Sequence, residues 1–430
     1  MKKIKFLVPL IFVCNLIFAQ QISLKDQSIE QFKKENYTLA ISLMEKALAD
    51  NPNDAEIYYY LGFFNHFKAY DSRPLQGYDS TCSEKVLNYL DKALAINPKY
   101  GDAKYFYFTE CSAVAFKEYQ NNNLSKVRSN FDKAFNKGVI PEWAIELGKN
   151  MLNSCDSNAI LFTHGDFLLN ICLFTQLHYN FRKDITVVPL ALLDRPSFVM
   201  SLNNNVSSPV LRGLKTGLTK EQIMDIHPYK WDTLTVSLPI PNQLLTFYSL
   251  NNGYKMDWVI EPDLISNRMT AKIEGENSRT RTYLSPTRAI LLSIIETNNW
   301  NRPIYFTKTF ETYFLAGLDK YFQNCGLVFK LTPIKTDNTQ WKINVTAFED
   351  LVLNTKLDKL KTIIDNDQPR ASGIIGIYGN SYYWLADYYR SVGKKGEISK
   401  IIDKYKQNLL IGFNHENEKR LLNAIEKLKN

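Results

Sequence analysis

One short turn of the chain carries residue types that could do chemistry, Thr163-His164-Gly165-Asp166. It lies between an apolar run at 159–162 and a longer one that begins at 167. A turn between a strand and a helix is a common ligand position in α/β sheets, and a helix N-terminus attracts polar or anionic groups. His164 and Asp166 are therefore candidate ligand-binding residues. The alternative is that Asp166 only caps its own helix, which we favour because no glycine-rich loop or second acidic group accompanies the turn.

A second candidate lies in the tract "NNWNRPIYF" at 298–306. Trp300 and Arg302, together with Tyr305, could form a stacking-and-charge site for a sugar. The alternative is that Trp300 belongs to the core and Arg302 pairs with a helix end. We favour this alternative, with the two asparagines before Trp300 ending the preceding helix.

The other reactive residue types form no recognisable catalytic pattern. No two of the histidines have zinc spacing with a carboxylate or cysteine nearby, so we predict no metal site; they are His66, His164, His178, His227 and His415. The cysteines contain no C-x-x-C pair, although one disulfide stays possible after export. The sequence has neither a G-x-S-x-G elbow nor a P-loop. We therefore predict no catalytic residue and no cofactor.

The elements that must position these candidates are predicted from periodicity. A short apolar run at 159–163, a longer helical run at 167–181 and a β-branched run at 184–193 indicate a parallel β-α-β unit. Further strands are predicted at 230–240, 257–262, 302–310 and 326–334. A helix is predicted over 285–300, with Ser285 as N-cap and Pro286 at its first position. We expect a mixed α/β domain at 158–345.

The region 21–150 contains an internal repeat. "AISLMEKALADNP" at 40–52 matches "VLNYLDKALAINP" at 86–98, at a period of 46 residues, which is 34 plus an insertion of 12. Thirty-four residues is the period of tetratricopeptide repeats, which residues 21–138 therefore resemble. The expected packing positions are Ala40, Met44, Ala47, Pro52, Tyr58, Leu61, Gly62, Ala93 and Pro98.

The predicted fold class is thus α/β plus α. Tetratricopeptide-like helical repeats are followed by the mixed α/β domain and by a helical region at 346–430. Within that last region, 381–405 is typical of a helix, a glycine-containing turn and a second helix. We expect this helical hairpin to resemble one more tetratricopeptide unit.

The first 19 residues have the layout of a secretory signal peptide, with a basic start, a short apolar segment and a boundary at Ala19. We expect the mature chain to be exported to the periplasm or the cell exterior and to be soluble after cleavage. Its formal net charge would fall from +8 to +5, because the leader holds three lysines and no acidic residue. This mild charge, with no cluster of basic residues, argues against nucleic acid as a partner.

Three motifs in order resemble the soluble C-terminal region of the DUF2723 family, membrane proteins related to protein O-mannosyltransferases. They are "AILFTHGD…DITVVPLALL", "ILLSIIETNNWNRPIYFTKTF" and "GLDKYFQNCGLVFKLTPIK". The resemblance implies a link to protein O-glycosylation. Two departures separate this chain from the family. No membrane spans accompany the motifs here, and Phe167-Leu168-Leu169-Asn170-Ile171 stands where the family has Asn-Asp-Thr-Phe-Pro. Transferase activity is therefore not carried over.

These observations favour an exported, non-catalytic binding or scaffold protein that recognises a partner protein or glycan in the cell envelope. The groove of the helical repeats is the expected recognition surface. The alternative is a soluble accessory subunit, or a degenerate relative, of a membrane protein O-glycosyltransferase. In that case a membrane glycosyltransferase would be the partner.

Overall fold

A computed structural model describes nine stretches of the chain. They are 23–71, 78–121, 123–204, 214–263, 283–310, 312–337, 339–363, 371–412 and 415–429. The predicted signal peptide at 1–19 lies outside the described residues. No helix within the described stretches is long and apolar enough to cross a membrane.

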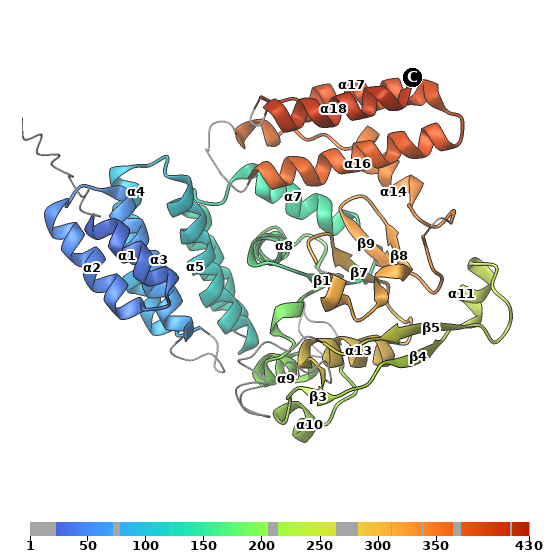
Figure 1. Cartoon of the computed structure of the whole chain (residues 1–430), viewed down its shortest axis with the longest axis horizontal. Helices are drawn as coiled ribbons and strands as arrows, with labels where there is room; N and C mark the ends of the chain where they lie inside the picture. The colour runs from blue at the N-terminus through green and yellow to red at the C-terminus, as the bar shows by residue number, and fades with distance from the viewer. Residues whose placement is uncertain are drawn as a thin grey trace, which may run out of the picture.

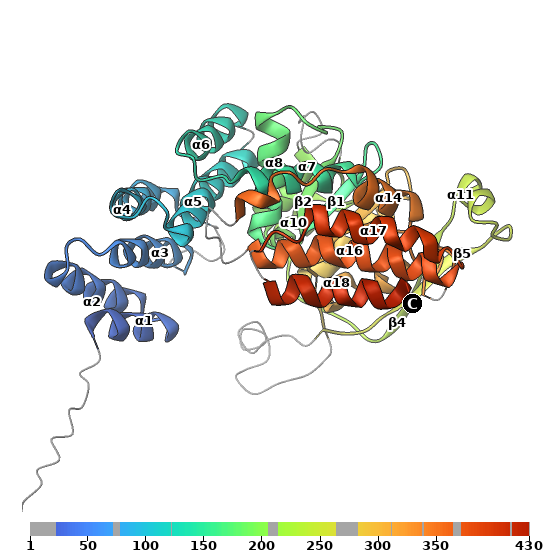
Figure 2. The same cartoon turned by 90° about the horizontal axis from the view of Figure 1, so that it is seen from above.

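The N-terminal part is an array of helices, each packed against the next (Figures 1 and 2). The helices are α1 (Leu24–Lys33), α2 (Tyr37–Asp50), α3 (Ala55–Asp71), α4 (Ser83–Ile96), α5 (Gly101–Gln120) and α6 (Leu124–Asn136). The small and apolar repeat positions Ala40, Met44, Ala47, Leu61 and Ala93 are all buried. Pro52 and Pro98 stand just after the ends of α2 and α4, which proline cannot continue.

One repeat position depends on glycine. A Cβ atom at Gly62 would lie 3.1 Å from the side chain of Leu90 and 3.4 Å from the carbonyl oxygen of Val86. The contact with Leu90 is tighter than an ordinary van der Waals contact, so the missing side chain lets α3 approach α4 closely. Tyr58, on the same helix, is half-buried and its ring lies 6.5 Å from that of Tyr89.

The centre of the molecule is a five-stranded mixed sheet with the strand order β2-β1-β7-β9-β8. Its strands are β1 (Ile160–Thr163), β2 (Thr186–Pro189), β7 (Ile304–Thr307), β8 (Phe322–Asn324) and β9 (Val328–Leu331). β1 pairs in parallel with both β2 and β7, while β9 runs antiparallel to β7 and β8. Helix α8 (Asp166–His178) connects β1 to β2, so the predicted parallel β-α-β unit is confirmed.

Two of the predicted strand regions lie outside this sheet. The region 230–240 provides part of β3 (Tyr229–Lys230) and β4 (Leu234–Pro239), and the region 257–262 falls in β5 (Lys255–Ile260). β4 and β5 form a two-stranded antiparallel ribbon, and β3 pairs with β6 (Tyr283–Leu284). Burial alternates along β5, so only one face of the ribbon is covered by the rest of the protein. The ribbon lies on the opposite side of the molecule from α1–α4 (Figure 1).

Further helices surround these strands. They are α7 (Glu142–Asn153), α9 (Pro196–Asn204), α10 (Lys220–Met224), α11 (Asn242–Phe247), α13 (Pro286–Asn298) and α14 (Val345–Glu349). Helix α13 matches the helix predicted over 285–300, with Ser285 at its N-cap and proline at its first turn.

The C-terminal region contains more than the predicted hairpin. Helices α16 (Ala371–Ser391) and α17 (Lys395–Asn408) form that hairpin, and α18 (His415–Lys429) packs against both of them. The three helices lie together beside α7 and α14 (Figure 1). The buried Leu422 and Ile425 give α18 an apolar face, which explains why it joins the pair.

One hydrophobic core connects the helical array, the sheet and the C-terminal helices, while a smaller one lies within α1–α3. Helix α7 crosses the predicted boundary at residue 150 and packs against α8. Helix α14 crosses the predicted boundary at residue 345 in the same way. The domain boundaries themselves stay predictions.

Candidate functional site

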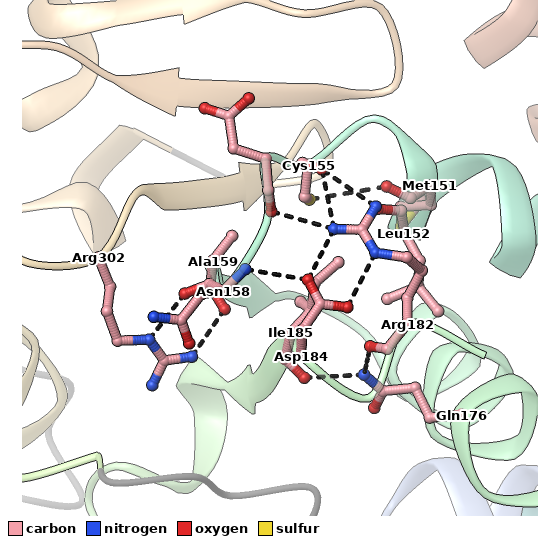
Figure 3. Close-up of polar contacts among 11 residues, drawn as sticks. Met151, Leu152, Cys155, Asn158, Ala159, Gln176, Arg182, Asp184, Ile185 and Arg302 are labelled. Carbon is pink, nitrogen blue, oxygen red and sulfur yellow. Dashed lines mark hydrogen bonds and ion pairs between the residues drawn. The ribbon is translucent and has the colours of Figure 1, made fainter. Parts of the chain in front are cut away.

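Arg302 lies at the end of the sheet where the parallel strands begin (Figure 3). Its Nε donates to the carbonyl of Asn158 at 2.8 Å, and its Nη2 donates to the carbonyl of Ala159 at 2.9 Å. The same Nη2 donates to Thr186 Oγ1 at 2.7 Å. Arg302 therefore ties the start of β1 to the start of β2, whereas the favoured sequence interpretation had it pair with a helix end.

A second arginine closes the same end of the sheet. Arg182 forms a fork with Asp184, with Nε to Oδ1 and Nη2 to Oδ2 both at 2.9 Å (Figure 3). Its Nη1 also donates to the carbonyls of Leu152 and Cys155, at 3.0 and 3.2 Å. Leu152 lies in the last turn of α7, and its carbonyl also accepts from the backbone N–H of Cys155 at 3.2 Å. Arg182 thus holds the C-terminus of α7 against the sheet.

The carboxylate of Asp184 is equally engaged. Besides the fork, its Oδ2 accepts from the backbone N–H of Asn158 at 2.9 Å. The hydrogen bonds from Arg182 lower the pKa of Asp184 to about 2. The contacts of Arg302, Arg182 and Asp184 link the start of β1, the start of β2 and the C-terminus of α7. These residues therefore stabilise the fold.

Trp300 is held away from Arg302. Its Nε1 donates to the carbonyl of Pro239, at the end of β4, at 3.0 Å. Asn299 and Trp300 both have positive φ, of 41° and 62°, which makes the sharp exit from α13. The side chain is half-buried against the core. The structure therefore does not bring Trp300 and Arg302 together into a sugar site.

His164 lies at the opposite end of the sheet, where β1 ends. Its backbone N–H donates to Thr307 Oγ1 at 3.2 Å, and its Nδ1 lies 3.0 Å from the carbonyl oxygen of Thr309. Its ring lies 5.1 Å from that of Phe310. These contacts attach the turn after β1 to the turn after β7 and occupy one face of the imidazole.

Asp166 is the first residue of α8 and is exposed. The N-cap is Gly165, with a φ of 83° that a residue with a side chain rarely adopts, and no side chain caps the helix. The alternative in which Asp166 is the N-cap residue therefore does not hold. Its carboxylate lies instead in the first turn, where it interacts favourably with the helix dipole.

The structure brings Asp166 together with side chains that sequence reasoning missed. A cavity of about 110 Å³ opens at the carboxyl ends of β1 and β2, next to the N-terminus of α8. Its lining includes Thr163 and Asp166 from the turn, His66 from α3, Lys117 from α5, and Arg195 from the segment after β2. Arg195 could have been suspected, because the carboxyl ends of parallel strands meet at one edge. His66 and Lys117 are distant in sequence from the turn at 163–166, and no motif connects them with it.

A buried polar network forms one wall of this cavity. His66 Nδ1 lies 2.6 Å from Glu110 Oε2, and the hydroxyl of Tyr78 donates to Glu110 Oε1. Glu110 is fully buried and His66 is 4% exposed. Lys117 Nζ donates to the carbonyl of Tyr78 at 3.3 Å. The carboxylate of Glu110 is thus satisfied by two donors inside the protein.

A larger, mostly apolar groove lies elsewhere, between the β4–β5 ribbon, α10 and α13. Its volume is about 840 Å³. The apolar and aromatic part of its lining includes Tyr229, Trp231, Val236, Leu238, Trp258 and Ile260. The indole N–H groups of both tryptophans are bonded to backbone carbonyls, of Ile260 and of Ala316, each at 3.1 Å. Gln222, Asp225 and Glu296 add polar groups to the lining.

The described residues contain no cluster of metal-ligating side chains, and three of their cysteine thiols are kept protonated. No group of three histidine, cysteine or acidic side chains comes together among them. The five described cysteines are free, so no disulfide joins them. Burial raises the pKa of Cys111, Cys172 and Cys325 to about 12, which keeps these thiols protonated.

Residues 239–350 match the family described as TMEM260-associated domain 2. No curated protein matches the chain. The matched segment contains β5, α13 and three strands of the five-stranded sheet, and it supplies Trp258, Ile260 and Glu296 to the apolar groove.

Proposed function

We propose that this chain is an exported, non-catalytic binding or scaffold protein of the cell envelope. It recognises a partner protein or glycan through the apolar groove between the β4–β5 ribbon and α13. The observation that carries this proposal is the groove itself, with its 840 Å³ volume and its aromatic lining. Such a concave, largely apolar surface with a few polar groups is typical of ligand sites.

The chemistry of the groove fits an extended chain with apolar groups. Because the N–H groups of Trp231 and Trp258 are already bonded to the protein, their rings offer apolar faces to a ligand. Aromatic faces pack against peptide side chains and against the C–H faces of sugars. Asp225, Gln222 and Glu296 would bind amide or hydroxyl groups of the same ligand.

The sequence supports the cellular setting of this proposal. The predicted leader favours export, and the resemblance of 21–138 to tetratricopeptide repeats favours a scaffold role for the helical array. In this proposal the array presents a second surface, while the groove provides the recognition that sequence reasoning had assigned to the repeats.

A second candidate is a soluble accessory subunit, or a degenerate relative, of a membrane protein O-glycosyltransferase. The match of residues 239–350 to a TMEM260-associated domain favours it, together with the resemblance of the sequence motifs to the DUF2723 family. In this case the groove would bind the transferase or the protein that it modifies.

A pair of substitutions on the ribbon tests the groove. Val236 and Trp258 face each other across β4 and β5 and both line the groove, whereas the next residue, Val259, is 46% exposed on the other face. We expect Val236→Lys to abolish capture of the partner, because a buried ammonium group is costly in an apolar groove. Val259→Lys should leave capture unchanged.

The measurement is cross-linked affinity capture by the tagged full chain from its own envelope fraction, with a glycan array as a second arm. A membrane glycosyltransferase as the dominant captured protein would favour the second candidate. Equal capture by both lysine variants and the unaltered protein would refute the groove as the recognition surface.

A further inference from the structure

We propose that the cavity at the carboxyl ends of β1 and β2 binds a phosphate-sized anionic group. This site is separate from the apolar groove, so it does not depend on the proposed function. The cavity lies where α/β sheets commonly bind ligands, outside the carboxyl ends of parallel strands. Its volume of about 110 Å³ suits a group of a few non-hydrogen atoms.

The first element of the site is the N-terminus of α8. This helix has 13 residues, and the N-cap Gly165 has no side chain to accept from its free N–H groups. Uncapped N–H groups at the positive end of a helix dipole attract anions. Both Gly165 and Asp166 line the cavity, so these donors lie at its wall.

The second element is the hydroxyl of Thr163. This side chain is 1% exposed and lines the cavity, yet its Oγ1 has no hydrogen-bond partner among the described residues. A buried hydroxyl without a partner costs free energy, typically about 1–3 kcal/mol. A ligand oxygen in the cavity would accept from this hydroxyl and remove the cost.

The third element is positive charge. The half-buried guanidinium of Arg195 makes neither a hydrogen bond nor a close ion pair within the described part of the chain, although its charge partly offsets the burial that raises the pKa of the adjacent Asp194. Lys117 lines the same cavity. Arginine offers planar pairs of donors that match phosphate and carboxylate oxygens.

Three acidic side chains lie near these donors. Asp194, which precedes the arginine, is half-buried, and burial raises the pKa of its carboxyl group. The carboxylate of Glu110 is already engaged by His66 and Tyr78 behind the wall. Asp166 is exposed and would lie at the edge of the site. Its negative charge would weaken the binding of an anion. Removing that charge should therefore strengthen binding, which gives the proposal a direction that a purely structural role for Asp166 would not produce.

The test is a titration of the full chain with inorganic phosphate, against chloride at matched ionic strength. Binding is followed by calorimetry and by the amide ¹H–¹⁵N signals of Gly165, Asp166 and Phe167. We expect saturable shifts of these signals with phosphate only. Arg195→Gln should weaken the affinity about tenfold, as expected for a lost charge-assisted contact. Arg390→Gln, an exposed change on α16, is the matched control and should have no effect.

Two further variants keep the proposal open to refutation if Arg195→Gln fails to fold. Thr163→Val should fold normally and bind phosphate about threefold more weakly, and Asp166→Asn should bind it more tightly. Glucose 1-phosphate binding more tightly than phosphate would indicate a phosphorylated sugar as the ligand, and equal affinities would indicate free phosphate. Absence of saturable shifts, or unchanged affinity in both Arg195→Gln and Thr163→Val, would overturn the proposal.

Discussion

The two ends of the central sheet use similar residues in opposite ways. At the end where the parallel strands begin, Arg182 and Arg302 donate to carbonyls and to a carboxylate of the protein itself. At the end where they finish, Arg195 and the buried Thr163 have no such acceptor among the described residues. An arginine next to a strand therefore says little about function until its acceptors are known. Satisfied donors stabilise the fold, and unsatisfied ones are available to a ligand.

The largest expected effect is a difference in the free energy of unfolding between variants of Arg182 and Arg195. Arg182→Ala should lower the free energy of unfolding by about 3 kcal/mol, because Asp184 loses both donors of the fork and the carbonyls at the end of α7 lose a charged donor. Arg195→Ala should change it by no more than about 0.5 kcal/mol, because the half-buried guanidinium has neither a hydrogen bond nor a close ion pair to lose among the described residues. Urea unfolding followed by circular dichroism measures both. Similar losses in the two variants would remove the distinction between the ends.

A smaller effect on the free energy of unfolding is expected when the pH is lowered. The pKa of Asp184 is lowered to about 2 in the folded protein, against about 3.9 in an unfolded chain. A lowered pKa means that the carboxylate contributes stability above about pH 4, and that this contribution is lost as the pH falls towards 2. The stability difference between the unaltered protein and Asp184→Asn should therefore shrink over this interval. Urea midpoints measured from pH 6 to pH 2 test this, and a constant difference would contradict it.

The smallest expected effect is at the turn that first suggested chemistry. Asp166→Asn should lower the free energy of unfolding by about 0.5 kcal/mol, because an exposed carboxylate in the first turn of α8 interacts only weakly with the helix dipole. The same urea measurement at neutral pH provides the test. A loss above about 2 kcal/mol would show that Asp166 has a structural partner that the present description lacks.

Local periodicity predicted much of the fold. The apolar runs around 159–193 were sufficient for β1, α8 and β2, because each element lies within its own stretch of sequence. The placement of 230–240 and 257–262 in a separate ribbon was not predictable, since it depends on which face finds a covering layer. The helical region predicted over 346–430 includes α18, although only the hairpin before it was described as separate helices.

The candidate sites were likewise predictable only where their residues are close together in the sequence. The turn at His164 and Asp166 was found because a strand-to-helix turn is a local signal. The tract with Trp300 and Arg302 was equally visible, but only the three-dimensional contacts of Arg302 show that it joins β1 to β2. His66, Lys117 and Arg195 reach one cavity from three distant parts of the chain. No spacing in the sequence could bring them together.

The most direct test compares a polar side chain that has a hydrogen-bond partner in the protein with one that has none among the described residues. Two matched threonines allow this comparison. Thr163 and Thr307 are the last residues of the neighbouring parallel strands β1 and β7, and each is 1% exposed. Thr307 Oγ1 accepts from the backbone N–H of His164 and bonds to Thr309 Oγ1, whereas Thr163 Oγ1 has no described partner.

The measurement is the free energy of unfolding of Thr163→Val and Thr307→Val, side by side and without ligand. We predict a loss of about 1 kcal/mol for Thr307→Val, and no loss or a gain for Thr163→Val, because only the first change removes hydrogen bonds. An equal loss in both variants would show that the Thr163 hydroxyl serves the fold, and would contradict the account.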